Sequence, residues 1–318
     1  MDTKSCHLFA KKYDVPVPTV TVIGSDGMLG QVLSRVLSDK GHDVYEVNRR
    51  GIGSIPSSKC LRFDPLEMDV EILKGVIGGS NFVVNCLGVI KQRIDERSIQ
   101  SVEEAFLVNS VFSRHLVLLC EELSTKLISI GTDCVFAGDQ SDYSEVDTHD
   151  AKDVYGISKS AGELVSYNHS LIRTSFIGLN DRYHREFLDW VLHQPAGARV
   201  KGFKNHWWNG LTTLQVSRVL NGMIQENYSP EGVFHLVPEG KVSKAEMIRL
   251  ISQMFHRRDL EIEEVNAENS VNRTLSTVKP EQVRHLWEVA GYKYVPDFRQ
   301  MLDELALWSL DSGHNDNR

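Results

Sequence analysis

A glycine-rich turn between a strand and a helix is the feature of this sequence that most restricts the fold. Residues 19–24, TVTVIG, form a β-branched run, and apolar residues at helical spacing follow from 29 to 37. Between them, Gly24, Gly27 and Gly30 have the spacing G-x-x-G-x-x-G. Such a turn lets the backbone approach a diphosphate, and the helix N-terminus points its free N–H groups at the phosphates. We therefore predict a dinucleotide-binding unit, the alternative being an ordinary glycine-rich turn. Further cofactor contacts are expected from Asp26, Met28 and Leu29.

The alternation of strands and helices continues to about residue 178. Strand-like runs lie at 42–50, 60–64, 81–88, 126–136 and 170–178, and helix-like runs at 65–76, 98–123 and 153–164. Apolar strands that alternate with helices indicate an α/β, Rossmann-like, doubly wound parallel sheet. We predict an NADP-binding domain over 19–178, with later segments contributing. A smaller C-terminal α/β substrate-binding lobe is expected over 179–310, with helices at 185–194, 213–226, 242–255 and 297–308. Residues 1–18 and 311–318 are expected to be flexible ends.

Charge and cysteine usage exclude several classes of protein. The 318-residue chain has a formal net charge of −8, whereas a duplex nucleic-acid binder normally has a basic surplus. The sequence has five cysteines, an odd number, and no C-x-x-C motif, which is typical of free thiols in a reducing compartment. No apolar run suits a signal peptide or a membrane span of about 18 residues. We expect a cytoplasmic protein without nucleic-acid or membrane partners, and no metal site, since the histidines do not cluster.

The end of the second strand indicates which dinucleotide binds. An acid at its tip would hydrogen-bond the ribose 2′-hydroxyl of NAD. The sequence there is EVNRRG, with Glu46 inside the strand and Asn48, Arg49 and Arg50 at the tip. A guanidinium matches a 2′-phosphate in charge and geometry, so NADP(H) is favoured over NAD(H). The sequence does not tell which arginine makes this contact, and the other is then a solvated loop charge.

Three further positions are candidate cofactor contacts. Asp64 follows the third strand, where it could accept the adenine amino group or cap the next helix. Cys86, Leu87 and Gly88 end the fourth strand, at the carboxyl edge where ligands bind in open α/β sheets. Asn109 interrupts an apolar helix, and a buried amide needs a partner. It could brace the active site and contact the cofactor, or satisfy a nearby backbone group.

The stretch DVYGISKSAGEL (153–164) places Tyr155 and Lys159 one helical turn apart. Thr132 ends the fifth strand at the same sheet edge as the glycine turn, so the three side chains can converge. Reduction of a ketone needs a proton at the carbonyl oxygen, and free tyrosine has a pKa of about 10. An adjacent ammonium is expected to lower that pKa, while Thr132 hydrogen-bonds the oxygen. A pair on a solvated helix face is the alternative, because Y-x-x-x-K is short.

These motifs together resemble extended short-chain dehydrogenases/reductases, and among them the dTDP-4-dehydrorhamnose reductase family of sugar-nucleotide enzymes. The matching stretches run from about residue 19 to 308 and include NCLG, TDCVFAG, YSEVD, YGISKSAGE, LIRTSFIG, GVFHLV and PDFRQMLDEL. The resemblance implies that Tyr155 is the proton donor, Lys159 its partner and ribose ligand, and Thr132 the carbonyl-binding hydroxyl. It implies NAD(P)H-dependent reduction of the 4-keto group of a nucleotide-linked 6-deoxyhexulose, for deoxysugar or polysaccharide biosynthesis.

The substrate side departs from the family at two positions. Gly131 stands where the family has serine, and Cys134 where it has tyrosine, which leaves the sugar open. Cys134 is expected to be an apolar filler of the pocket and not a nucleophile. Trp208 either stacks on the substrate or packs between lobes, and Arg273 either binds the diphosphate or is a surface charge. The predicted substrate-binding residues are Val89, Thr132, Asp133, Cys134, Trp208 and Arg273.

Two other functions remain open from the sequence. A sugar-nucleotide epimerase or dehydratase could use the same scaffold, but a dehydratase would carry a second acid beside Asp133, where Cys134 stands. A non-catalytic nucleotide-binding regulatory subunit is a role that the same family hosts, although the intact triad argues against it. Apolar helices leave a homodimer open. Arg173, inside a strand, is expected to have a carboxylate partner.

Overall fold

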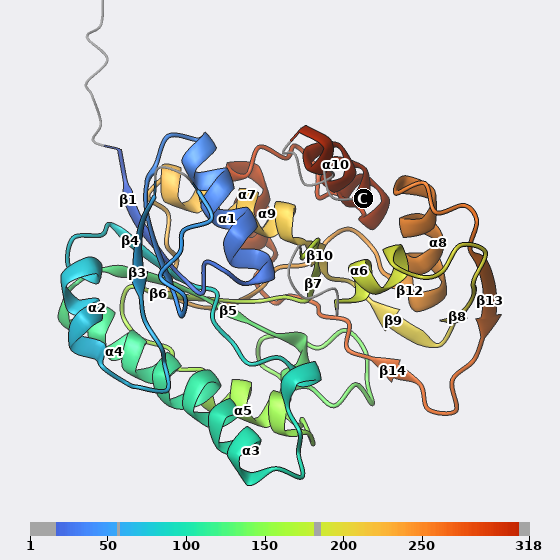
Figure 1. Cartoon of the computed structure of the whole chain (residues 1–318), viewed down its shortest axis with the longest axis horizontal. Helices are drawn as coiled ribbons and strands as arrows, with labels where there is room; N and C mark the ends of the chain where they lie inside the picture. Colours follow the sequence, from blue (N-terminus) through green and yellow to red (C-terminus); the bar gives the residue numbers. More distant parts are fainter. Residues whose placement is uncertain (1–16, 56–57, 181–185, 312–318) are drawn as a thin grey trace, which may run out of the picture.

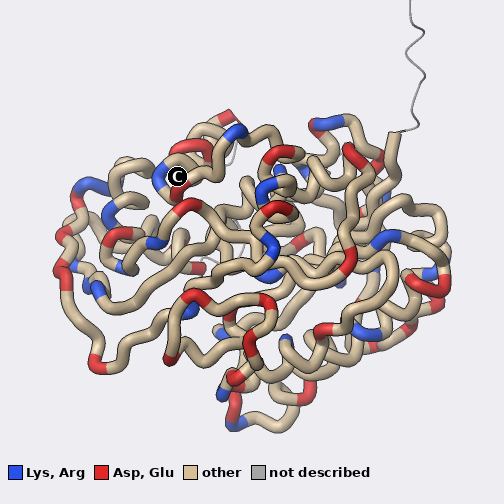
Figure 2. Tube along the Cα trace, turned by 180° about the vertical axis from the view of Figure 1, so that it is seen from behind, with Lys and Arg blue, Asp and Glu red and all other residues tan. Residues whose placement is uncertain are grey.

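The structure is a computed structural model that describes residues 17–55, 58–180 and 186–311 (Figure 1). The expected flexible ends lie outside the described residues, except for residues 17, 18 and 311. Within the described ranges, the model has no helix with the length and apolar character to cross a membrane. Figure 2 shows basic and acidic residues interspersed over one side of the molecule, without a stripe of one sign.

The centre of the molecule is a seven-stranded parallel sheet. Its strands are β1 (Thr19–Ile23), β2 (Asp43–Asn48), β3 (Lys59–Arg62), β4 (Phe82–Asn85), β5 (Lys126–Gly131), β6 (His169–Arg173) and β11 (Gly232–His235). They lie in the order β11-β6-β5-β4-β1-β2-β3. Because β1 pairs with both β2 and β4, the strand order reverses beside β1, where doubly wound sheets bind ligands. The predicted Rossmann-like α/β fold is confirmed.

Helices cover both faces of this sheet (Figure 1). On one face, α1 (Met28–Asp39) packs against α7 (Thr213–Gln225), with α9 (Pro280–Val289) beside α7. On the other face lie α2 (Val70–Ile77), α3 (Ile99–Phe106), η2 (Leu107–Phe112), α4 (Ser113–Glu122) and α5 (Val154–Gly162). Each face has its own apolar core, with Leu33 and Leu37 in the first and Phe112 and Leu116 in the second. The near-continuous apolar strands of the sequence follow from burial on both faces.

The smaller lobe consists of short strands and helices. Two strands, β8 (Arg199–Phe203) and β13 (Glu261–Val265), pair in parallel, and β12 (Val242–Ser243), β9 (His206–Trp208) and β14 (Val271–Asn272) form a second sheet. The pair β7 (Phe176–Ile177) and β10 (Leu211–Thr212) joins the lobe to the main sheet region. Its helices are α6 (Phe187–Leu192), α8 (Lys244–Met254) and α10 (Phe298–Asp311). The chain between them returns to the large sheet through α7 and β11, while the predicted domain bounds stay a prediction.

Several element boundaries differ from the sequence prediction. The helix expected at 65–76 begins only at Val70, because residues after Asp64 form a turn and Met68 has a φ of 51°. The fifth strand ends at Gly131 and continues as the 3-10 turn η3 (Asp133–Val135). A second 3-10 turn, η1 (Lys91–Arg93), follows β4. Helix α9 was not predicted, although Pro280 at its first turn is a common start signal.

The helix expected at 98–123 is continuous but not uniform. Its central residues, η2, are in the π-helical conformation, between α3 and α4. Single π-helical turns inside α-helices often lie at functional sites. Asn109, the amide noted in the sequence, lies in this turn.

Candidate active site

The glycine turn is built for close backbone contact. Gly24 has a φ of +79°, and a Cβ there would lie 2.9 Å from the Leu87 nitrogen. A Cβ on Gly30 would overlap the carbonyl oxygen of Gly24, so helix α1 can pack directly against the turn. The Gly24 N–H donates to the Val47 carbonyl at 2.8 Å, which ties the turn to β2. The N-terminus of α1 is therefore left facing the space above the sheet, as a diphosphate site requires.

A cavity of about 400 Å³ lies above this turn. Nine of the predicted cofactor contacts and one predicted substrate contact line it: Gly24, Asp26, Gly27, Met28, Leu29, Arg49, Cys86, Leu87, Gly88 and Val89. It continues past Pro65 and Leu66 in one direction and reaches Arg93, Phe176, Asn180 and Glu186 in another. A cavity that joins a φ-positive glycine turn, a helix N-terminus and an arginine fits a phosphorylated dinucleotide. Gly30, Asn48, Arg50 and Asp64 do not line it, and their cofactor contacts stay predictions.

The polar side chains at the end of β2 shape the loop that follows. The Glu46 carboxylate is buried and accepts hydrogen bonds from the Ser54 N–H at 2.8 Å and from the Ser54 and Ser58 hydroxyls. Asn48 donates to the Ser25 hydroxyl at 2.9 Å and accepts from the Arg50 N–H at 3.0 Å. Glu46 is thus engaged within the protein and is not presented to a ribose.

Asp64 has a local partner instead of a helix to cap. Its carboxylate accepts from the Leu66 N–H at 3.1 Å, which closes a turn before α2 begins at Val70. The expectation that Asp64 caps the helix is therefore wrong, because the chain makes the turn first. Contact with an adenine amino group stays a prediction.

Asn109 clamps the segment that follows β4. Its Oδ1 accepts from the Val89 N–H at 2.8 Å, and its Nδ2 donates to the Val89 carbonyl and to the Ser158 hydroxyl, both at 3.0 Å. The side chain is 1% exposed. The π-helical turn thus joins a wall of the cavity to α5, and Asn109 satisfies the backbone groups of Val89, while its role in the active site stays a prediction. A direct contact with the cofactor stays a prediction.

The structure brings Thr132, Tyr155 and Lys159 into one region. Thr132 accepts from the Cys134 N–H at 3.2 Å and caps η3, and it is hydrogen-bonded to Tyr155. Asp153 caps α5 by accepting from the Gly156 N–H at 2.8 Å. Lys159 reaches the cavity wall, since a Cβ built on Gly88 would lie 4.0 Å from its Nζ. Tyr155 and Lys159 therefore do not lie on a solvated face of their helix.

The protonation of the pair differs from the expectation. We expected Lys159 to lower the pKa of Tyr155, but burial of the phenol dominates and raises that pKa, and a hydrogen bond from Thr132 only partly offsets it. The Lys159 ammonium donates to the Ile130 carbonyl at 3.0 Å. Burial lowers the pKa of Lys159, while Glu163 and Cys86 raise it. The phenol accordingly keeps its proton at neutral pH.

A second charged group lies beside Thr132. Asp133 is 8% exposed, and burial raises its pKa against the opposing influence of Arg273 and Lys244. The Nε of Arg273 donates to the Phe136 carbonyl at 2.8 Å. Burial raises the pKa of the Cys134 thiol to about 12, so the thiol is not a nucleophile at neutral pH. The substrate contacts of these residues stay predictions.

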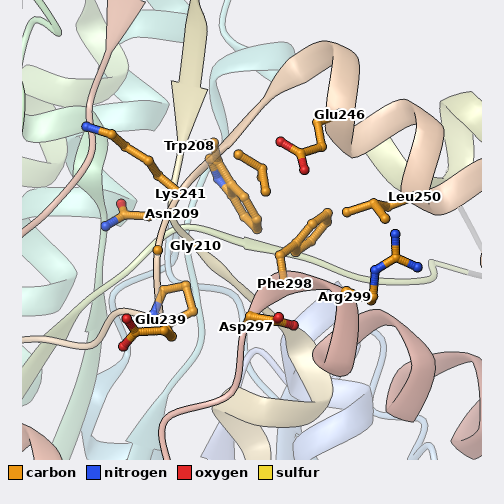
Figure 3. A pocket seen from close by; sticks show the side chains of 13 residues that line it. Trp208, Asn209, Gly210, Glu239, Lys241, Glu246, Leu250, Asp297, Phe298 and Arg299 are labelled. Atoms are coloured by element: carbon orange, nitrogen blue, oxygen red, sulfur yellow. The ribbon is translucent and has the colours of Figure 1, made fainter.

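Trp208 is 6% exposed and packs edge-on against Phe298, with ring centroids 5.2 Å apart. Its indole N–H donates to the Ser175 hydroxyl at 2.8 Å. The ring lies at a separate cavity of about 230 Å³. Figure 3 shows Phe298 near the ring, with Leu250 beyond Phe298 and the carboxylate of Glu246 above. The surroundings of Trp208 are those of a packing residue, and its substrate contact stays a prediction.

Arg173 has the expected carboxylate partner. Its Nε lies 3.0 Å from Oε1 of Glu163, and Arg173 is buried while Glu163 is partly buried. The guanidinium also contacts Nε2 of His235 at 3.1 Å. Because Glu163 follows Lys159 by one turn of α5, this ion pair fixes the end of the helix that carries the predicted catalytic residues.

Several residues near the site were not predicted, and five of them bear on its polarity and shape. Arg93, Phe176, Asn180 and Glu186 line the cavity, and Lys244 interacts electrostatically with Asp133. The first four follow β4 or β6, so the rule that ligands bind at the carboxyl edge of a sheet could have found them. Lys244 begins a helix of the smaller lobe, and no sequence signal relates it to Asp133.

The match to known families agrees with this geometry. A family model described as the RmlD substrate binding domain matches residues 18–306. The chain belongs to this family. It is 29% identical over 154 residues to a dTDP-4-dehydrorhamnose reductase of Mycolicibacterium smegmatis, covering 48% of this chain and 42% of that protein. It is 27% identical over 165 residues to the spore coat polysaccharide biosynthesis protein SpsK of Bacillus subtilis, covering 50% and 53%. The chain thus spans about half the length of these curated relatives in each match.

Solved structures share the fold over nearly the whole chain. The dTDP-4-dehydrorhamnose reductase of Bacillus anthracis in complex with NADP has a TM-score of 0.73 at 18% identity, covering 92% of this chain and 100% of that one. The Bordetella bronchiseptica enzyme WbmG in complex with NAD has a TM-score of 0.72 at 16% identity, covering 96% and 98%. MoeE5 in complex with UDP-glucose and NAD has a TM-score of 0.68 at 18% identity, covering 92% and 99%. At these identities the likeness shows the fold.

Proposed function

We propose that this chain is an NADPH-dependent reductase of the 4-keto group of a nucleotide-linked 6-deoxyhexulose. The observation that carries the proposal is the position of Lys159, whose Nζ would lie 4.0 Å from a Cβ built on Gly88 in the cavity wall, one helical turn after Tyr155, which itself interacts with Thr132. The names of two relatives support the reaction class, since they are dTDP-4-dehydrorhamnose reductase and dTDP-4-keto-6-deoxy-D-glucose reductase. The product would be a nucleotide-linked deoxysugar for polysaccharide assembly, in line with the name of the SpsK relative.

The cofactor would be held along the cavity. The turn at Gly24 and the N-terminus of α1 would bind the diphosphate, and Lys159 would hold a ribose. When bound, the nicotinamide supplies a hydride to the carbonyl carbon. Arg49 lines the cavity whereas Arg50 does not, so Arg49 is the arginine we assign to the 2′-phosphate of NADP. The engagement of Glu46 with Ser54 and Ser58 supports this preference, because the carboxylate of β2 is then not offered to a 2′-hydroxyl.

The proton would come from Tyr155. Its raised pKa keeps the phenol protonated, so Oη can donate the proton to the carbonyl oxygen as the alcohol forms. Thr132 would donate a hydrogen bond to the same oxygen and stabilise the developing charge. The Lys159 ammonium would stabilise the phenolate that remains until the phenol is reprotonated from solvent. Asp153 and the Arg173–Glu163 pair would hold the two ends of α5 in place.

The proposal is tested by following NADPH oxidation at 340 nm with a panel of nucleotide-linked 4-keto-6-deoxyhexoses. We expect the parent protein to consume NADPH and the Tyr155→Phe variant to lose at least about a hundredfold in kcat. The variant should still bind NADPH, which a fluorescence titration would show. Binding of NADPH without consumption of cofactor by any keto-sugar would refute the reductase, and a changed sugar without net NADPH oxidation would indicate an epimerase.

A further inference from the structure

Helix α5, which carries Tyr155 and Lys159, does not end in the way that helices commonly do. It has nine residues, and Glu163, directly after it, is extended, with a φ of −71° and a ψ of 122°. Helices commonly end in a left-handed glycine, which lets the following N–H groups bond to the last carbonyls. The last four carbonyl groups of a helix have no partner inside it, so those of α5 depend on donors from other segments.

The helix beside α5 supplies two such donors. The Ser110 hydroxyl donates to the Ser158 carbonyl at 2.7 Å. The Arg114 Nε donates to the Ala161 carbonyl at 2.8 Å, and a second Arg114 nitrogen lies 3.4 Å from the Glu163 carbonyl. Ser110 lies in η2 and Arg114 follows it by four residues in α4, so both side chains lie on one side of a continuous helix. Figure 1 shows α5 alongside this helix.

The two helices are in direct backbone contact at the same end of α5. A Cβ built on Gly162, the last residue of α5, would overlap the carbonyl oxygen of Asn109 in η2. Ser110 is buried at this contact, and Arg114 covers it from the surface. The guanidinium also places a positive charge at the negative, C-terminal end of the helix dipole. The two donors therefore act where the backbones already meet, and they fix where α5 lies along its neighbour.

We propose that Ser110 and Arg114 are positioning residues, which hold α5 so that Tyr155 and Lys159 keep their places in the site. Neither is among the described residues that line the cavity above the glycine turn, so neither is a catalytic residue. Lys159 is less than one turn from the end of α5, so a shift of that end would move its Nζ away from Gly88. A displacement of about 1 Å between reacting groups can lower a rate about a hundredfold. This inference rests on the proposed function, because it assigns the residues that set the geometry of the same site from outside the cavity.

The test compares the parent with Arg114→Met, Ser110→Ala and Arg114→Lys in NADPH oxidation, NADPH titration and hydrogen exchange. We expect Arg114→Met to lower kcat about tenfold and to raise the Kd for NADPH about fivefold, with the KM for the keto-sugar changed less than about twofold. Ser110→Ala should act in the same direction. Arg114→Lys keeps a cationic donor and should recover about threefold or more of the lost kcat. The amides of α5 should exchange faster in Arg114→Met than in the parent.

Arg257 provides a matched control. It holds the C-terminal end of α6 in the same way, by donating to the carbonyls of Leu192 and, at 2.8 Å, of Gln194, and it is also paired with Asp259. It lies in the smaller lobe and is not among the described residues that line the cavity. Arg257→Met should lower the urea midpoint, as Arg114→Met does, but leave kcat and the Kd for NADPH within about twofold of the parent.

Other results contradict the inference. Faster exchange in α5 with unchanged kcat and Kd would make Arg114 a stabilising cap only, and unchanged exchange would show that these bonds do not hold the helix. An equal loss of kcat in Arg257→Met would assign the effect to overall stability, and no recovery in Arg114→Lys would separate the loss from the donor. A parent protein that reduces no keto-sugar would refute the proposed function and not this inference, which the Kd for NADPH and the exchange of α5 would then decide.

Discussion

Replacing Asn109 by leucine tests whether the π-helical turn holds the wall of the cofactor cavity. The leucine keeps the volume of the side chain but removes three hydrogen bonds, of 2.8 Å from the Val89 N–H, 3.0 Å to the Val89 carbonyl and 3.0 Å to the Ser158 hydroxyl. Ser158 keeps its 3.0 Å bond to the Tyr155 carbonyl, so its loss is small. The two Val89 groups lose their protein partner altogether.

The magnitude follows from those two groups. An unsatisfied buried donor or acceptor costs about 1–3 kcal/mol, and water can reach part of half-buried Val89, so we expect the free energy of unfolding to fall by about 2–4 kcal/mol. The segment Gly88–Val89 is then free to move away from Lys159. A loss of one cofactor contact of about 1.4 kcal/mol would raise the Kd for NADPH about tenfold.

Asn205 provides a matched control. It clamps Ala267 by the same two-bond pattern, with Nδ2 to the Ala267 carbonyl at 2.8 Å and the Ala267 N–H to Oδ1 at 2.9 Å, in the smaller lobe. Asn205→Leu should lower stability by about 1–3 kcal/mol without changing the Kd for NADPH. Urea unfolding and NADPH fluorescence titration measure the two quantities. A destabilised Asn109→Leu variant that binds NADPH like the parent would refute the role of this clamp in the site.

Three further predictions concern the cofactor turn, cofactor choice and pH. Gly30→Ala should lower the free energy of unfolding by about 1–3 kcal/mol, because its Cβ would overlap the Gly24 backbone, while Gly75→Ala, in open space within α2, should raise it by about 0.5–1 kcal/mol in urea unfolding. Arg49→Met should lower kcat/KM for NADPH relative to kcat/KM for NADH about tenfold, and Arg50→Met should lower this ratio less. A larger loss of the ratio in Arg50→Met would assign the 2′-phosphate to Arg50 instead. The pKa of Lys244 falls from 10.5 to about 8 on folding, so the charged ammonium lowers the free energy of unfolding. This cost is complete below about pH 8 and disappears as the pH rises toward 10.5. The stability advantage of Lys244→Met over the parent should therefore shrink across that range in pH-dependent thermal unfolding, and an advantage independent of pH would contradict this pKa.

The order of the elements was predictable from the sequence, and so were nine of the residues that line the cavity above the glycine turn. The β-branched run before Gly24, the apolar spacing of α1 and the alternation that follows are local patterns, and local periodicity directly reports which face of an element is buried. Tyr155 and Lys159 are one helical turn apart whatever surrounds them. Their meeting with Thr132 follows from the parallel sheet, in which every strand ends at the same edge.

The protonation of the site was not predictable, because it depends on burial by distant segments. The sequence suggested a tyrosine with a lowered pKa, but burial outweighs the effect of nearby charge and raises it. The choice between Arg49 and Arg50 likewise depends on how the loop after β2 is folded by Glu46 and Asn48.

By itself, then, the sequence determined a doubly wound α/β chain with a dinucleotide turn and a Tyr155–Lys159 helix, because these features depend on residues that lie two to seven positions apart. Only the tertiary structure decided that Asn109 lies in a π-helical turn and clamps Val89, that β11 returns to the main sheet, and that Lys244 interacts electrostatically with Asp133. Each of these depends on packing between segments 20 to more than 100 residues apart, and nothing in the local pattern of either segment encodes the other.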